Sequence, residues 1–65
     1  MPIVQVTVPE NTWTLDEKAE LAEALTEAFA RVARDTGKGE QRDLVAVQIH
    51  EARVGGYALG GRVVE

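Results

Sequence analysis

The sequence contains no cysteine, one histidine, and one residue each of tryptophan, tyrosine and phenylalanine. Without cysteine the chain can form no disulfide and offers no thiolate nucleophile, and a single histidine leaves a structural zinc site without its usual ligands. Small domains that lack both disulfides and metals are usually supported by oligomerisation. Oligomerisation is therefore the support that we expect here.

Positive charge and long apolar runs are also scarce. The 7 Lys and Arg residues stand against 11 Asp and Glu, a formal net charge of −4, whereas nucleic-acid sites are built from clustered basic residues. No apolar run approaches the roughly 20 residues of a membrane span, and the N-terminus lacks the charged start and apolar core of a signal peptide. We expect a soluble, cytoplasmic protein with no nucleic-acid or membrane partner.

The length of 65 residues fits one domain, residues 1–65. A chain of this size buries only about 60% of the surface that its unfolded form exposes. A single copy would have a thin hydrophobic core, which again favours an obligate oligomer.

Residues 3–8 are predicted to form a strand, because β-branched residues dominate and the two faces alternate. One face carries Val4, Val6 and Val8, and the other carries Ile3, Gln5 and Thr7. Pro9 ends the strand because it has no N–H for the ladder. Pro2 precedes the strand directly, so removal of Met1 would leave a secondary amine where the strand starts.

A helix is predicted from Thr14 to about Arg34. Thr14 and Glu17 fit a capping box, and a glycine-rich segment from Gly37 onward stops the helix. The expected apolar stripe consists of Leu21, Leu25, Ala28 and Val32, flanked by Ala22, Phe29 and Ala33. The opposite face is expected to be solvated, and it carries Lys18, Glu20, Glu23, Glu27, Arg31 and Arg34.

Residues 44–50 are predicted to form a second strand. Val45, Val47 and Ile49 face the helix, and Leu44, Ala46, Gln48 and His50 face away. A strand, a long helix and a strand make a βαβ unit with parallel strands, and two glycine pairs around Tyr57 predict a hairpin in the tail. The fold class is therefore α+β: a βαβ unit with two parallel strands, one long amphipathic helix and a C-terminal hairpin. The helix-free face of its sheet has no partner within the chain.

Several features occur together along the chain. They are Pro2 after the start methionine, a strand, a capped amphipathic helix, Val45-Ala46-Val47-Gln48-Ile49-His50-Glu51, and Tyr57-Ala58-Leu59-Gly60-Gly61. In this combination the chain resembles the small 4-oxalocrotonate tautomerase family of the tautomerase superfamily over essentially its whole length. The resemblance implies a subunit that assembles as dimers and commonly as a trimer of dimers, a hexamer. It also implies an isomerase in which the processed N-terminal proline is the general base for a keto–enol substrate, and we expect no cofactor.

Carried over by position, Pro2 matches the catalytic proline, and Tyr57 matches the aromatic residue before the Gly-x-Gly-Gly turn that closes the pocket. The family's loop arginine falls at or near Trp13, and its strand arginine falls on Ala46. In the family those arginines hold the substrate's carboxylate and polarise its carbonyl. Their absence argues against a dicarboxylate keto acid as the substrate.

The remaining predicted site residues have polar or aromatic side chains suited to a small carbonyl substrate. These substrate-binding candidates are Trp13, Gln48, His50, Tyr57, Arg42 and Arg53. Gln48 and His50 would orient the substrate oxygen, whereas an arginine, with Arg62 as a further candidate, would replace the missing charge from this or a neighbouring subunit. Trp13 and Tyr57 would wall the pocket.

Each of these residues also has a purely structural interpretation. In that interpretation Pro2 simply starts a strand behind a retained Met1, and its amide nitrogen has no basic lone pair. His50 would make hydrogen bonds at a strand end, and Trp13 would pack beside the helix cap or against another subunit. Two other functions stay open: a Pro2-dependent hydratase, addition or C–C bond-forming enzyme, and a non-catalytic oligomer that has kept only the scaffold.

Overall fold

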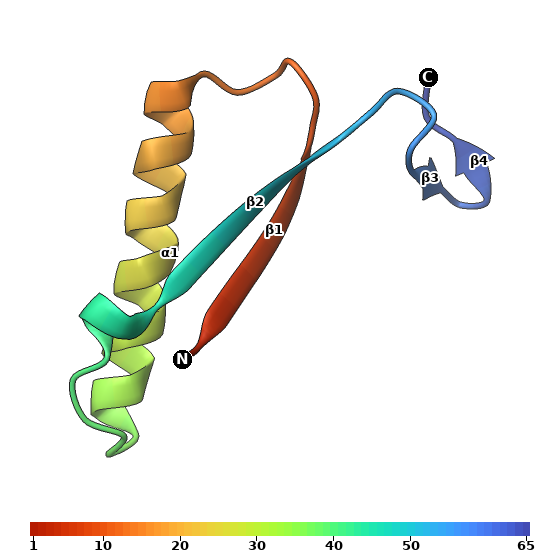
Figure 1. Ribbon diagram of the computed structural model, residues 1–65. Helices are drawn as coiled ribbons and strands as arrows, with labels where there is room; N and C mark the ends of the chain where they lie inside the picture. The colour runs from red at the N-terminus through yellow and green to blue at the C-terminus, as the bar shows by residue number, and fades with distance from the viewer.

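The computed structural model describes residues 1–65 and confirms the predicted α+β fold. In chain order its elements are β1 (Ile3–Pro9), α1 (Leu15–Asp35), the short 3-10 helix η1 (Arg42–Leu44), β2 (Ala46–Ala52), β3 (Ala58–Leu59) and β4 (Arg62–Val63). Helix α1 lies along one side of the parallel pair β1–β2, and the antiparallel hairpin β3–β4 stands away from the far end of β2 (Figure 1).

The alternation predicted for the first strand is confirmed. Val8 is buried and Val4 and Val6 are half-buried, whereas Ile3, Gln5 and Thr7 are exposed. Pro9 is the last residue of β1 rather than the residue after it, and the ladder continues because the Glu10 N–H donates to the Ala52 carbonyl over 2.8 Å. Alternate residues of a parallel strand bond to the partner, so the missing N–H of Pro9 falls at a position that β2 does not use.

Both predicted ends of α1 are confirmed by hydrogen bonds. The Thr14 hydroxyl accepts the Glu17 N–H over 3.1 Å, and the Glu17 carboxylate accepts the Thr14 N–H over 2.8 Å, which completes the capping box. At the other end Gly37 has a φ of 79°, and the Lys38 N–H donates to the Ala33 carbonyl over 2.8 Å. A glycine in the left-handed region, followed by a residue whose N–H bonds back to a carbonyl in the last helical turn, is a Schellman motif, which ends the helix.

The apolar stripe of α1 is rotated from the predicted one. Ala28 and Val32 were predicted to lie in the stripe but are exposed, Val32 by 53%. The covered residues are Ala30 and Ala33, which are buried, and Leu21, Ala22, Leu25, Thr26 and Phe29, which are half-buried. The prediction for Ala28 and Val32 is wrong because a sheet of only two strands is too narrow to cover every apolar row of the helix.

The second strand begins later than predicted. Leu44 is the last residue of η1, and the Val45 N–H closes that turn by donating to the Arg42 carbonyl over 3.5 Å, so β2 starts at Ala46. The predicted faces are confirmed: Val45, Val47 and Ile49 are half-buried, whereas Gln48 and His50 are exposed. Ile3 of β1 pairs with Ala46 at one end of the sheet, and Pro9 pairs with Ala52 at the other.

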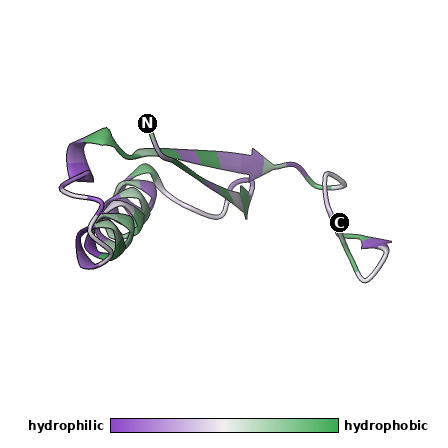
Figure 2. Cartoon of the chain, turned by 90° about the horizontal axis from the view of Figure 1, so that it is seen from below, coloured by the Kyte–Doolittle hydropathy of each residue, from purple (hydrophilic) through white to green (hydrophobic).

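A single chain has almost no core. Only Val8, Ala30 and Ala33 are buried, and the chain exposes 5040 Å², whereas a compact protein of 7.1 kDa exposes about 4,100 Å². The radius of gyration is 14.7 Å, against about 11 Å for a compact domain of this length. Figure 2 shows the reason: α1 lies on one side of the strands, the other side is uncovered, and the hairpin projects beyond them. None of the helices has the length and apolarity of a membrane-crossing segment.

Candidate active site

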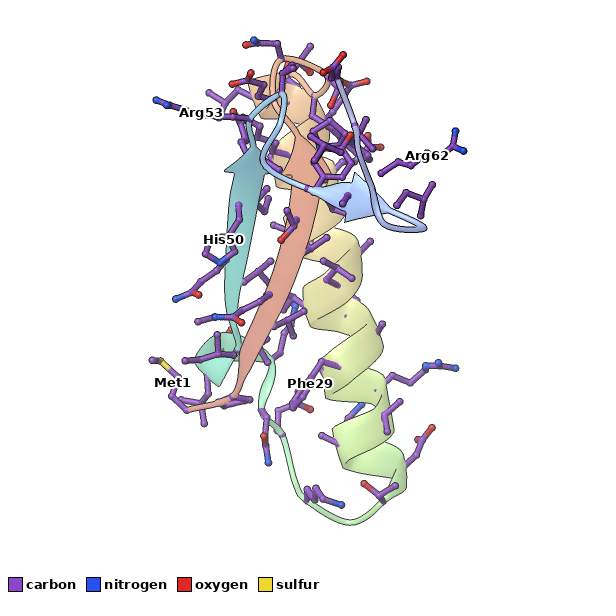
Figure 3. All side chains as sticks on the ribbon, turned by 90° about the vertical axis from the view of Figure 1, so that its right-hand side faces the viewer. Met1, Phe29, His50, Arg53 and Arg62 are labelled. Carbon is purple, nitrogen blue, oxygen red and sulfur yellow. The ribbon has the colours of Figure 1, made fainter.

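Pro2 lies half-buried immediately before β1, at the end of the sheet that carries η1. Its neighbour Met1 is labelled at this end of the sheet in Figure 3. The Pro2 carbonyl accepts a hydrogen bond from the Ala46 N–H over 3.0 Å, so the start of β2 fixes its position. The neighbouring residues at this end are apolar and open to solvent: Met1 is 87%, Ile3 51% and Leu44 58% exposed. Pro2 therefore stands at an apolar end of the sheet that is not closed over within one chain.

Gln48 and His50 lie on the helix-free face of the sheet, as predicted. The Gln5 side chain donates to the Gln48 side-chain oxygen over 2.9 Å, directly across the parallel ladder. His50 pairs in register with Thr7 and is exposed on β2 (Figure 3). This row supplies amide, hydroxyl and imidazole groups, all of which can bind a carbonyl or enol oxygen.

Trp13 and Tyr57 lie at the other end of the sheet, and each is 39% exposed. Tyr57 closes one side of a shallow cavity of about 270 Å³, whose other lining residues are Thr7, Val8, Pro9 and Ala52. None of the cavities of the chain is lined by Pro2. Seven strand residues rise about 23 Å, so Pro2 and Tyr57 cannot share a pocket within one copy.

Arg53 is the first residue of a tight turn that leads from β2 into the hairpin. The Gly56 N–H donates to the Arg53 carbonyl over 2.7 Å, and Gly55 has a φ of 82°. A Cβ atom on Gly56 would lie 2.8 Å from the Arg53 carbonyl oxygen, so the turn requires glycine there. Arg53 and Arg62 take part in none of the ion pairs of the chain, and both extend from the molecule in Figure 3.

Arg42, the other predicted cation, is held against α1. Its Nη2 donates to Glu23 over 2.7 Å, its Nε donates to Glu27, and its Nη1 lies 3.7 Å from Asp43. The hydrogen bonds with Glu27 and Glu23 raise the pKa of Arg42 above its ordinary value. Arg42 also lines a wide groove of about 510 Å³ between α1 and β2.

The polar face of α1 was predicted to be solvated, and Glu23 and Glu27 are indeed exposed whereas Lys18 is half-buried, but all three also form ion pairs. Glu23 and Glu27 bind Arg42, and Lys18 forms an ion pair with Glu51 of β2. The spacing of Glu23 and Glu27 places them on one helix face a turn apart, which is the sequence signal that a single arginine could bind both. Their partner lies beyond a loop, and the sequence alone does not identify it.

Comparison with known proteins identifies the family. A family model described as tautomerase enzyme matches residues 2–65. A crystal structure of a 4-oxalocrotonate tautomerase homologue superposes with a TM-score of 0.68 at 30% sequence identity, over 97% of this chain and 90% of that one. The comparison with curated proteins found no match. The chain belongs to the tautomerase enzymes, in the 4-oxalocrotonate tautomerase family.

Proposed function

We propose that the protein is a tautomerase in which the amine of Pro2, freed by removal of Met1, is the general base. The amine takes a proton from the carbon next to a carbonyl, and the C–H electron pair moves to the carbonyl oxygen to form an enolate. The protonated amine then gives the proton to the enolate oxygen, which yields the enol, and ketonisation runs the same two steps in reverse. Bonds and charge balance without an oxidant, a reductant or a cofactor.

The position of Pro2 supports this assignment and carries the proposal. Its ring fixes φ, and its carbonyl is bonded to the Ala46 N–H over 3.0 Å, so the nitrogen would be held at the strand start with little freedom. Burial in apolar surroundings lowers the pKa of an amine toward neutrality. The exposed Ile3 and Leu44 provide such surroundings once another surface covers them.

The covering surface is proposed to be further copies of the chain, in a dimer-based assembly such as a trimer of dimers. The chain exposes 5040 Å², about 900 Å² more than a compact monomer of its mass. Pro2 stands at one end of β1, and Trp13 and Tyr57 lie at the other. A neighbour whose strands run antiparallel would bring its Trp13 and Tyr57 beside Pro2, where they would exclude water from the reacting atoms.

The substrate is proposed to be a small carbonyl compound with less negative charge than a dicarboxylate. Ala46, which occupies the position of the family's strand arginine, places a methyl group beside the start of β1, where Ile3 is its register partner. Arg42 is engaged by two carboxylates, whereas Arg53 is unpaired and is the candidate for one substrate carboxylate, supplied from a neighbouring copy. Gln48 and His50 are candidates for stabilising the enolate oxygen.

The test compares two proteins in which the Pro2 nitrogen is either a free amine or an amide. One is the chain with Met1 removed, verified by mass spectrometry, and the other keeps one residue before Pro2, which makes its nitrogen an amide. Ketonisation of phenylenolpyruvate should be faster with the trimmed protein by about 10² to 10⁴, the usual contribution of a positioned base. The rate with the trimmed Pro2→Ala variant should lie between the rates of these two proteins, since the variant keeps an amine but loses the ring.

Equal rates for the trimmed and extended proteins, at equal assembly by sedimentation, would refute the proposal. Trapping of Pro2 by borohydride with an aldehyde, together with equal ketonisation rates, would instead assign Pro2 to iminium chemistry, in which its nitrogen is a nucleophile.

A further inference from the structure

Arg42 connects η1 to α1 through a two-carboxylate clasp. Nη2 binds Glu23 over 2.7 Å and Nε binds Glu27, two carboxylates that lie one helical turn apart. A planar guanidinium fork fits such a pair of carboxylates, and a lysine ammonium does not reproduce its geometry. The other two residues of η1 are exposed, Leu44 by 58%, so Arg42 is the side chain that ties this turn to the helix.

The clasp is linked to Pro2 by backbone hydrogen bonds. The Arg42 carbonyl accepts the Val45 N–H over 3.5 Å, which ends η1 and directs the chain into β2. At the next residue, the Ala46 N–H donates to the Pro2 carbonyl over 3.0 Å. The position of Pro2 therefore depends on where β2 starts, four residues after Arg42.

The charges around Arg42 oppose a direct role in binding an anionic substrate. One guanidinium faces two carboxylates, so the clasp has a net charge of −1 before Asp43 is included. The bonds with Glu27 and Glu23 also raise the pKa of Arg42. An incoming carboxylate would have to displace a partner that α1 holds in place.

We propose that Arg42 is a positioning residue for Pro2, which fixes the start of β2, and with it the proline, through its clasp on Glu23 and Glu27. The proposal rests on the proposed role of Pro2 as the base. It differs from the expectation that Arg42 binds substrate, because in this arrangement Arg42 acts without touching the substrate.

The test uses the trimmed, assembled protein with two changes that separate the roles. Arg42→Gln removes the cation, whereas the double variant Glu23→Gln with Glu27→Gln keeps the cation and removes its anchors. Positioning predicts that both lower kcat for phenylenolpyruvate, by about tenfold, since a displacement of about 1 Å at a reacting group can cost up to 10². KM should change less than twofold.

The pH dependence of kcat/KM adds a measurement that a loss of stability alone would not change. A loosened Pro2 is more hydrated, which raises the pKa of its amine, so the acid limb of kcat/KM should shift to higher pH in both variants. Arg42→Lys should recover only part of kcat, because it restores the charge but not the fork. Arg31→Gln is the matched control, since Arg31 is exposed on α1 and takes part in none of the ion pairs of the chain, and it should behave as the wild type.

Two outcomes would overturn the inference. If Arg42→Gln raises KM while the double glutamate variant leaves or lowers KM, Arg42 binds substrate. If neither variant changes kcat while the Pro2 extension still abolishes activity, the proposed function stands and Arg42 has no positioning role. Should Arg42→Gln not assemble, Glu27→Gln alone removes one bond of the clasp and gives the same comparison with a smaller loss.

Discussion

Truncation of Leu59 is expected to weaken assembly strongly. Leu59 lies in β3, is 78% exposed in the single chain, and belongs to a hairpin whose strands have two residues each. An isolated hairpin of this size is marginal in water. We therefore expect the hairpin to be ordered against a neighbouring copy, with Leu59 among the residues that the contact buries.

The expected magnitude follows from that exposure. Full burial of a leucine side chain contributes about 1.5 to 3 kcal/mol, so Leu59→Ala should remove about 2 kcal/mol per copy. A two-fold interface contains each contact twice, which gives about 4 kcal/mol. At 1.4 kcal/mol per tenfold, the Kd of the dimer should rise roughly 10³-fold.

Sedimentation velocity over a dilution series would measure this change, with ketonisation activity followed at each concentration. Leu15→Ala is the matched control, since Leu15 is 81% exposed but lies in the first turn of α1. The variant Leu59→Ala should dissociate and lose specific activity at concentrations where the wild type and Leu15→Ala remain assembled. Coincident dissociation curves for all three proteins would show that the hairpin is not an assembly contact.

Three further changes test other parts of the structure. Thr14→Ala removes the hydroxyl that accepts the Glu17 N–H and should lower the free energy of unfolding by about 1 kcal/mol, measured by calorimetry at fixed protein concentration; no change in Tm would contradict the cap's role. Gly56→Ala places a Cβ 2.8 Å from the Arg53 carbonyl oxygen and should destabilise the folded assembly by more than about 1 kcal/mol, whereas an unchanged denaturation midpoint would show that the turn can shift. Ala46→Arg should raise the ratio of kcat/KM for a dicarboxylate enol to kcat/KM for a neutral enol by at least about tenfold, the equivalent of one charge-assisted hydrogen bond. An unchanged ratio would show that residue 46 does not contact the substrate.

Local signals in the sequence predicted most of the fold. The alternation of Val4, Val6 and Val8 set the buried face of β1, because a strand's side chains alternate strictly. The Thr14 capping box and Gly37 set the ends of α1 through bonds between residues close in sequence. A strand, a long helix and a second strand follow one another in the chain, and the usual arrangement of such elements is a parallel βαβ unit.

Features that depend on distant partners were less predictable. The spacing of apolar residues indicated a helix face, but only the width of the sheet decided that Val32 would be exposed. Arg42, which we propose fixes the start of β2, has its partners across a loop on α1. The candidate site was predicted as a set of residues, and the structure separates that set along β1, with Pro2 at one end and Tyr57 at the other. Under the proposed assembly, the geometry of the site would be formed by more than one copy.

The bond between Pro2 and Ala46 also bears on when the enzyme would become active. Pro2 joins the ladder through its carbonyl, and it has no N–H to contribute, while Met1 is 87% exposed. Cleavage of the Met1–Pro2 peptide bond would therefore break no ladder hydrogen bond, and the same fold would accept both forms of the chain. Under the proposed mechanism the untrimmed protein is a folded zymogen. Its maturation would be a single chemical step, separable in time from folding and assembly, and the degree of N-terminal processing would set activity at a constant amount of protein.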